Sequence, residues 1–206
     1  AGDRFFYVNP LESNGDHHRQ AWYGCACCPS QISRFLPSIG NYIYGTSDKA
    51  LWVNLFIGNT TEVTIDGKKV VMKQETDYPW DGLVKLTVTS EQPLGKELRI
   101  RIPGWCKSYT LSVNGNKVDS TTDKGYTVIK EWKTGDLIVL NMDMPVEKVS
   151  ADPRVRQNTG KRALQRGPRV YCLEETDNAK DFADLALTPT SSFEVKDEPD
   201  NLLSLI

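Results

Sequence analysis

Val84-Lys85-Leu86-Thr87-Val88-Thr89 is the stretch on which the prediction of the fold depends. Its apolar and polar residues alternate, which is the period of a β-strand with one buried and one exposed face. Other short runs rich in β-branched and aromatic residues follow one another along the chain: 42–44, 51–57, 62–65, 70–74, 97–102, 109–113, 126–131, 137–141 and 169–173. Turn signals such as Asp66-Gly67 and Asn114-Gly115 separate them. This pattern predicts a mainly β fold, an antiparallel β-sandwich of the jelly-roll type.

Residues 29–39 have a helical period instead. Four apolar residues repeat at i, i+3, i+4 and i+7: Ile32, Phe35, Leu36 and Ile39. Pro29 suits the first position of a helix, where its missing N–H is not needed. Cys28 is then expected at or near the N-cap, with Cys27 just before it. Free backbone N–H groups at a helix start favour a thiolate there.

Three of the five cysteines fall within four residues: Cys25, Cys27 and Cys28. An odd count leaves at least one thiol without a disulfide partner, and adjacent Cys27 and Cys28 cannot readily bond to each other. The cluster can hold a metal, supply a nucleophilic thiolate, or do both, and three unrelated thiols are the alternative. A tetrahedral Zn²⁺ site would need further ligands from a distant carboxylate, His or Cys. Cys106 and Cys172 lie in strand-like sequence, and each is expected to be a small buried hydrophobe.

Other side chains are weaker candidates. His17 and His18 could be ligands or sugar-binding donors, although such a pair is also often merely solvated. Four carboxylates lie near other marked residues, but no spacing singles out a catalytic pair: Glu12, Asp16, Glu75 and Asp77. Trp80 could stack on a sugar, or it could pack on its own loop.

Composition narrows the function classes. The chain has 206 residues, of which 39% are hydrophobic and 25% charged, and its net charge is −2. These values suit a globular domain, and they predict neither a nucleic-acid partner nor an acidic membrane partner. No apolar run is long enough to span a membrane, and localisation is left open. The chain begins with Ala1, so we expect a mature product or an excised fragment, and its apolar final run 202–206 indicates a cut made inside a domain.

Seven blocks of sequence carry a family resemblance: Asn9-Pro10-Leu11-Glu12-Ser13, His18-Arg19-Gln20-Ala21-Trp22-Tyr23-Gly24-Cys25-Ala26-Cys27-Cys28-Pro29-Ser30-Gln31-Ile32-Ser33-Arg34, Tyr42-Ile43-Tyr44, Leu51-Trp52-Val53-Asn54-Leu55, Gln74-Glu75-Thr76-Asp77-Tyr78-Pro79-Trp80, Arg101-Ile102-Pro103-Gly104-Trp105 and Ala163-Leu164-Gln165-Arg166-Gly167-Pro168-Arg169-Val170-Tyr171. In this order, and over nearly the whole chain, they resemble the β-L-arabinofuranosidases of glycoside hydrolase family 127. The family resemblance implies a catalytic α/α toroid followed by β-sandwich domains. Residues 1–40 would be the C-terminal end of the toroid, and residues 41–206 a β-sandwich truncated at its C-terminus.

The resemblance also implies a chemistry. In the family, the first Cys of the Cys-Cys pair attacks the anomeric carbon with retention, which assigns the nucleophile to Cys27. Both cysteines of the pair bind Zn²⁺, so Cys27 and Cys28 would be metal ligands, while Cys25 matches a family cysteine without an assigned role. The remaining ligands, a Glu and a Cys, and the acid/base glutamate lie upstream in the family. The isolated chain is therefore expected to be inactive, with its own upstream helical domain as partner.

The implied substrate is a plant-derived, arabinose-containing glycan, with His18 and Trp22 as possible sugar contacts. Two other functions stay open. One is a carbohydrate-binding module that uses the side chains of Trp52, Trp80 and Trp105, with the cysteines as a structural metal cluster. The other is a purely structural sandwich that steadies a neighbouring domain.

Overall fold

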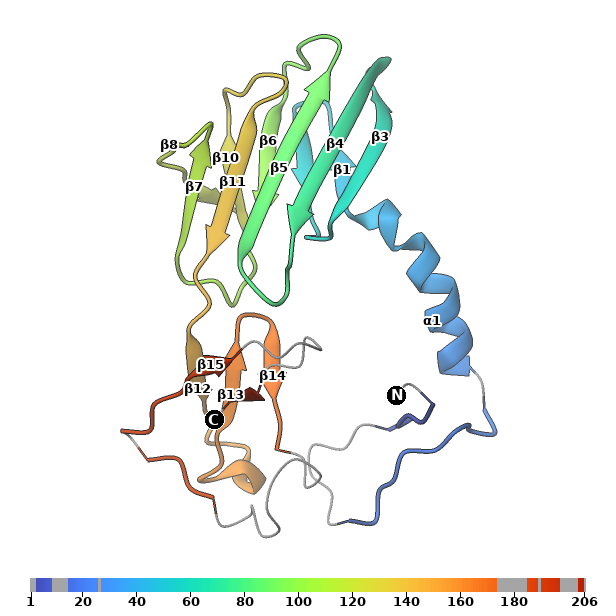
Figure 1. The fold of residues 1–206 in the computed structure, drawn as a ribbon, viewed down its shortest axis with the longest axis vertical. Coiled ribbons are helices and arrows are strands. Elements are labelled where there is room, and N and C mark those ends of the chain that lie inside the picture. The colour runs from blue at the N-terminus through green and yellow to red at the C-terminus, as the bar shows by residue number, and fades with distance from the viewer. Residues whose placement is uncertain are drawn as a thin grey trace. The chain divides into compact units, whose positions relative to one another are not determined.

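The computed structural model describes residues 3–8, 15–25, 27–173, 185–188, 190–196 and 204–205. The chain divides into two compact units, Ala1–Tyr42 and Ile43–Ile206, which we call unit 1 and unit 2 (Figure 1). The Asn9-Pro10-Leu11-Glu12-Ser13 block, and with it the candidate carboxylate Glu12, lies outside the described residues. Among the described residues, no helix is long and apolar enough to cross a membrane.

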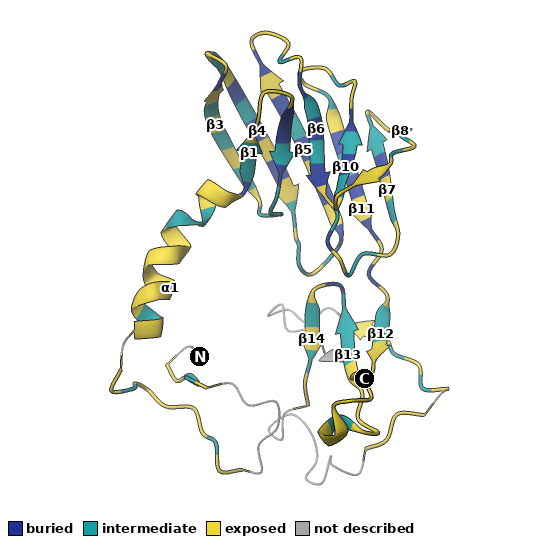
Figure 2. Ribbon diagram, turned by 180° about the vertical axis from the view of Figure 1, so that it is seen from behind, coloured by how far each residue is buried: buried dark blue, intermediate teal, exposed yellow. Residues whose placement is uncertain are grey.

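Unit 1 contains the predicted helix. Helix α1 spans Cys27–Ser38 and continues into the 3₁₀ helix η1, Ile39–Tyr42. The helix begins two residues before Pro29, so Cys28 lies near the helix start, as predicted, while Cys27, expected just before the N-cap, is the first helical residue. Cys27 and Cys28 both lie in the first turn, where a proline three residues in is tolerated because these N–H groups have no partner within the helix. The apolar face of α1 is exposed in this chain, with Ile32 57% and Leu36 58% accessible (Figure 2).

Unit 2 confirms the mainly β prediction. A five-stranded sheet has the order β1-β2-β6-β10-β9, with bounds Tyr44–Thr46, Ala50–Val53, Glu97–Arg101, Tyr126–Ile129 and Thr122–Asp123. A six-stranded sheet has the order β3-β4-β5-β11-β7-β8, with bounds Asn59–Ile65, Lys68–Thr76, Leu83–Ser90, Leu137–Met142, Tyr109–Val113 and Asn116–Lys117. Pairing is antiparallel between neighbouring described strands except for β2 and β6, which run parallel.

The core lies between these two sheets. Along β5 the side chains of Val84, Leu86 and Val88 are almost completely buried, as the alternating pattern predicts. Residues of the five-stranded sheet, such as Leu98 and Ile100, belong to the same apolar cluster. Burial of each such side chain contributes about 1.5–3 kcal/mol. The dark blue residues in Figure 2 accordingly follow the strands of both sheets.

A smaller sheet follows the sandwich and differs from the prediction. Strands β12 (Val146–Val149), β13 (Ala163–Arg166) and β14 (Arg169–Tyr171) pair antiparallel, and the sequence pattern indicates only the last of them. β12 has the sequence Val-Glu-Lys-Val, which lacks the alternation that marks a strand. Two further short strands, β15 (Val195–Lys196) and β16 (Ser204–Leu205), pair with each other.

The two isolated cysteines do not both lie in the core. Cys106 is half-buried against the core, and its Sγ donates to the Ser108 carbonyl at 3.2 Å. Cys172 is exposed, so the prediction that it is a buried hydrophobe is wrong. β14 ends at Tyr171, and Cys172 is therefore past the pairing that would have covered its side chain.

A buried lysine connects the turns at one end of the sandwich. The Lys96 side chain is 3% exposed, and its Nζ donates to the carbonyls of Ser47 at 2.6 Å and Asp48 at 3.0 Å. The same ammonium lies 2.9 Å from Oδ2 of Asp66, in the turn between β3 and β4. The indole N–H of Trp132 donates to the Lys96 carbonyl at 2.8 Å. One cation therefore links loops that belong to different sheets.

Replacing Lys96 by Met should destabilise the sandwich because two backbone carbonyls lose their charged donor. We expect the free energy of unfolding to fall by about 1–3 kcal/mol. Urea denaturation followed by tryptophan fluorescence measures the change. Lys69→Met is the matched control, because Lys69 makes an exposed ion pair with Glu62 and its loss should have little effect. Equal losses in the two variants would contradict the role given to Lys96.

Candidate functional site

A short pairing of backbone segments organises the start of unit 1. Phe5 and Gln20 form an isolated antiparallel bridge, with both N–H···O distances at 3.0 Å. The aromatic run 4–9 has a composition that favours a strand, but within the described residues it pairs only at this single bridge. The Tyr23 hydroxyl adds a 3.1 Å bond to the Phe5 carbonyl. This pairing brings residues 3–8 beside the segment that leads into the cysteine cluster.

Aromatic side chains hold Tyr7 in place. The ring centroids of Tyr7 and Tyr23 are 5.1 Å apart, and those of Phe5 and Tyr23 are 5.6 Å apart. Trp22 contacts Phe5 edge-on at 6.3 Å. Such contacts each add a modest stabilisation beyond area burial, of about 0.5–1.5 kcal/mol. They give the Tyr7 ring a defined position without a large core.

The Tyr7 hydroxyl lies against two sulfurs at the start of α1. Its Oη is 3.0 Å from Cys27 Sγ and 3.1 Å from Cys28 Sγ. The Cys25 thiol donates to Cys27 Sγ at 3.4 Å, and the Cys27 and Cys28 sulfurs are 3.8 Å apart. All three thiols are exposed in this chain. The structure therefore brings the three clustered cysteines together and adds a phenol that the sequence analysis did not include.

Hydrogen bonds to Cys27 favour its charged form. The Tyr7 hydroxyl is the largest cause, followed by the neighbouring Cys25 and Cys28 thiols, and together they lower the pKa of Cys27 from 9.0 to about 7. The pKa of Tyr7 is raised in turn, because the phenol keeps the proton that it donates to the sulfurs. The thiolate is the reactive form of cysteine, and both the hydrogen bonds and the position at a helix start stabilise it.

The spacing of the paired sulfurs fits a shared metal ion. Two thiolates bound to one tetrahedral Zn²⁺ at about 2.3 Å lie about 3.8 Å from each other. The Cys27 and Cys28 sulfurs are 3.8 Å apart, so they could form one edge of such a tetrahedron. Within the described ranges, no group of three or more His, Cys, Asp or Glu side chains is arranged to hold a metal. Cys27 and Cys28 thus offer two sulfur atoms, whereas a tetrahedral zinc site needs four ligands.

The two histidines differ in their surroundings. The His17 ring stacks on Phe6 with centroids 4.8 Å apart, and its Nε2 is 2.8 Å from the Val8 carbonyl oxygen. His17 therefore has a local structural role. His18 is exposed next to it, and Trp22 is 61% exposed. Both side chains are accessible in this chain, and their contact with a sugar stays a prediction.

The tryptophans of unit 2 have intramolecular neighbours. The Arg99 guanidinium lies 4.9 Å from the Trp52 ring, which also meets Tyr126 edge-on at 4.8 Å. Trp105 is half-buried and stacks beside Tyr78 at 6.4 Å. Both rings are half-buried and contribute to the packing of the sandwich.

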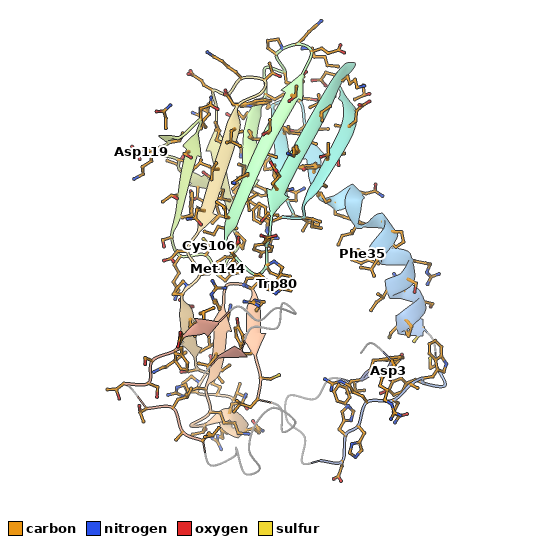
Figure 3. All side chains as sticks on the ribbon, viewed as in Figure 1. Asp3, Phe35, Trp80, Cys106, Asp119 and Met144 are labelled. Carbon is orange, nitrogen blue, oxygen red and sulfur yellow. The ribbon has the colours of Figure 1, made fainter. Side chains whose placement is uncertain are left out.

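Trp80 is likewise engaged by the smaller sheet. The Arg169 guanidinium lies 5.7 Å from the Trp80 ring, and Nη1 of Arg166 donates to the Trp80 carbonyl at 2.6 Å. Trp80 and Met144 mark the side of the sandwich next to that sheet (Figure 3). The nearby carboxylates Glu75 and Asp77 belong to unit 2, whereas the cysteine cluster belongs to unit 1.

Sequence reasoning missed Tyr7. Its signal was present in the run Phe5-Phe6-Tyr7, because alternation places Phe5 and Tyr7 on the same side of an extended segment. What the pattern could not supply was the partner, since Tyr7 and Cys27 are separated by 20 residues.

Comparison with known proteins gives the chain a consistent set of relatives. Three family models match it in succession: the β-L-arabinofuranosidase GH127 catalytic domain over residues 1–41, the GH127 middle domain over 50–144 and the glycoside hydrolase family 127 C-terminal domain over 146–201. A non-reducing end β-L-arabinofuranosidase of Bifidobacterium longum subsp. longum is 38% identical over 200 residues, which cover 88% of this chain and 30% of that protein.

Solved structures agree with this match. A GH127 β-L-arabinofuranosidase from Geobacillus stearothermophilus T6 is 46% identical with a TM-score of 0.89, covering 97% of this chain and 34% of that one. A second GH127 β-arabinofuranosidase is 39% identical with the same TM-score and the same coverage. The chain thus spans about a third of the length of these relatives.

Replacing Tyr7 by Phe should raise the pKa of Cys27 towards 9.0, because the principal donor to the thiolate is lost. The wild-type alkylation rate at Cys27 should reach half its maximum near pH 7. At pH 7 the variant should react roughly tenfold more slowly. Iodoacetamide labelling of chelator-treated chain, mapped to Cys27 by mass spectrometry, measures the rates.

Tyr23→Phe is the control for this experiment, because the Tyr23 hydroxyl donates to the Phe5 carbonyl and not to a thiol. An unchanged pH profile in Tyr7→Phe would show that the phenol does not set the thiol's charge state.

Proposed function

The chain belongs to glycoside hydrolase family 127, and from this premise we propose that it is the C-terminal part of a retaining, zinc-dependent β-L-arabinofuranosidase. The proposed substrates are arabinose-containing glycans of plant origin. The observation that carries the proposal is the Cys27 thiol in the first turn of α1, 3.0 Å from the Tyr7 hydroxyl. Residues 1–40 would close the catalytic domain, and residues 41–206 would form the sandwich part.

Cys27 is the proposed nucleophile. Its thiolate would attack the anomeric carbon, forming a C–S bond as the bond to the leaving oxygen breaks. Water would then displace the sulfur, and two inversions give net retention. The lowered pKa supports this role, because about half of the Cys27 thiols are charged near pH 7 without a metal. Tyr7 would hold the sulfur in place through its hydroxyl.

The acid and base steps would come from outside this chain. The leaving oxygen needs a proton in the first step, and the attacking water must lose one in the second. We propose that a glutamate in a preceding helical domain performs both, so the chain alone should not turn over. His18 and Trp22 are the proposed sugar contacts on this side of the site.

Cys27 and Cys28 are the proposed zinc ligands of the chain. Their 3.8 Å sulfur separation supports this assignment. A Glu and a Cys of the preceding domain would complete the four ligands. When bound, the metal would keep the sulfurs deprotonated and oriented. The exposed apolar face of α1, which includes Ile32 and Leu36, supports the proposal that a larger helical domain packs against this unit.

Unit 2 has a structural role in this proposal. The alternative is a carbohydrate-binding module, for which stacking tryptophans would be the main contacts. An arginine guanidinium lies 4.9 Å from the Trp52 ring and another 5.7 Å from the Trp80 ring, and Trp105 packs on the core; these internal contacts support the structural role.

In the longer enzyme that carries this chain, Cys27→Ala should reduce kcat roughly 1,000-fold or more, because the nucleophile is removed. An aryl β-L-arabinofuranoside is the substrate for the assay. Cys172→Ala is the matched control, since Cys172 is an exposed thiol of unit 2 and its loss should leave the rate unchanged. Near wild-type activity in Cys27→Ala would rule out the nucleophile assignment.

Metal content tests the shared zinc site separately. The longer enzyme should bind one zinc per chain, whereas the isolated 206-residue chain should retain none after dialysis, because its two ligands are half of a tetrahedral set. Elemental analysis of both proteins, and of Cys28→Ser in the longer one, gives the stoichiometry. Stoichiometric zinc in the isolated chain, or in Cys28→Ser, would contradict the ligand set.

A further inference from the structure

Cys25 belongs to the thiol cluster, but the proposed hydrolysis assigns no role to this residue. Its sulfur lies 3.4 Å from Cys27 Sγ, closer than the 3.8 Å between the sulfurs of Cys27 and Cys28. Both Cys25 and Cys27 are exposed. A disulfide bond is about 2.0 Å long, so the two sulfurs, now 3.4 Å apart, would have to move about 1.4 Å closer to form one.

The backbone also favours this pair. A bond between Cys27 and Cys28 would close a small ring around their shared planar peptide, and both residues lie within the first helical turn of α1. Cys25 precedes the helix in irregular backbone, and one residue separates it from Cys27. The larger ring between Cys25 and Cys27 can therefore close while Cys27 stays in the helix.

We propose that Cys25 is a resolving thiol, which forms a reversible disulfide with Cys27 when the protein meets a peroxide. Cys25 and Cys27 together would be a site of oxidative modification. Only the effect of their disulfide on hydrolysis rests on the proposed function. Reactive cysteines next to a second thiol commonly behave in this way.

The reaction has two steps. The Cys27 thiolate attacks one peroxide oxygen, so that an S–O bond forms, the O–O bond breaks and hydroxide leaves. The sulfur is oxidised by two electrons to a sulfenic acid, and the peroxide is reduced. The Cys25 sulfur then attacks the Cys27 sulfur: an S–S bond forms, the S–O bond breaks, and the departing hydroxide takes the Cys25 proton as water.

The disulfide has a clear consequence for the site. It would remove the proposed nucleophile from use and keep Cys27 from further oxidation to a sulfinic acid, which thiols do not reverse. A dithiol reductant would return two electrons and restore both cysteines. Cys28 would remain a free thiol throughout.

Peptide mapping tests the proposal directly. Cleavage after Arg19 and Arg34 places all three cysteines in one tryptic peptide, residues 20–34. The full chain is treated with hydrogen peroxide, denatured, alkylated with iodoacetamide and sequenced by tandem mass spectrometry. The oxidised peptide should be two hydrogens lighter before alkylation and carry the alkyl group on Cys28 alone. It should fragment between residues 27 and 28 but not between residues 25 and 27. Dithiothreitol should make all three cysteines alkylatable.

Two serine variants make the test specific. Cys25→Ser should form no disulfide, and its Cys27 should gain two oxygens that dithiothreitol does not remove. Cys28→Ser, the same substitution on the other side of Cys27, should still form the disulfide. The proposal is overturned by a bond that includes Cys28, by no loss of hydrogens in the wild type, or by equally reversible oxidation in Cys25→Ser. The peptide masses do not depend on glycosidase activity. The disulfide proposal can therefore fail or succeed independently of the Cys27→Ala assay, which tests the proposed function.

Discussion

Burial of alternate strand residues between two sheets is the constraint on which unit 2 depends. Val84, Leu86 and Val88 of β5 face the same cluster as Ile138 and Leu140 of the neighbouring β11. A slip of one residue in the register would turn each of these sets outward, so the packing specifies the strand pairing. The turns at the end of the sandwich are thereby placed close enough for the Lys96 ammonium to join the β3–β4 turn to the Ser47–Asp48 loop.

Unit 1 is held together differently. Its thiols are positioned by one backbone bridge, a few aromatic contacts and the first turn of α1, with no residue of that helix buried. The chemistry nevertheless depends on these few contacts, because a single hydroxyl reaches both Cys27 and Cys28. The arrangement suits the proposed function, in which a preceding domain supplies the remaining packing, metal ligands and acid/base group.

Arginine–aromatic contacts within unit 2 indicate that its tryptophans have a packing role. The rings of Trp52 and Trp80 are contacted by Arg99 and Arg169, which come from other strands of unit 2. Arg166 adds a hydrogen bond to the loop of Trp80, so the smaller sheet is tied to the sandwich. Aromatic residues that resemble sugar platforms in the sequence thus contribute to internal packing, whereas the reactive groups gather in unit 1.

The sequence alone determined the mainly β class, most strands of the two large sheets, the helix after the cysteine cluster and the family. Periodicity and motif spacing report which face of a local segment is buried, and that information is contained within a few residues. It did not reveal β12, whose residues lack alternation, or the exposure of Cys172 beyond the end of β14. The parallel pairing of β2 with β6 and the approach of Tyr7 to Cys27 were decided by the tertiary structure. Both depend on the path of the chain between segments far apart in sequence, and no local pattern specifies that path.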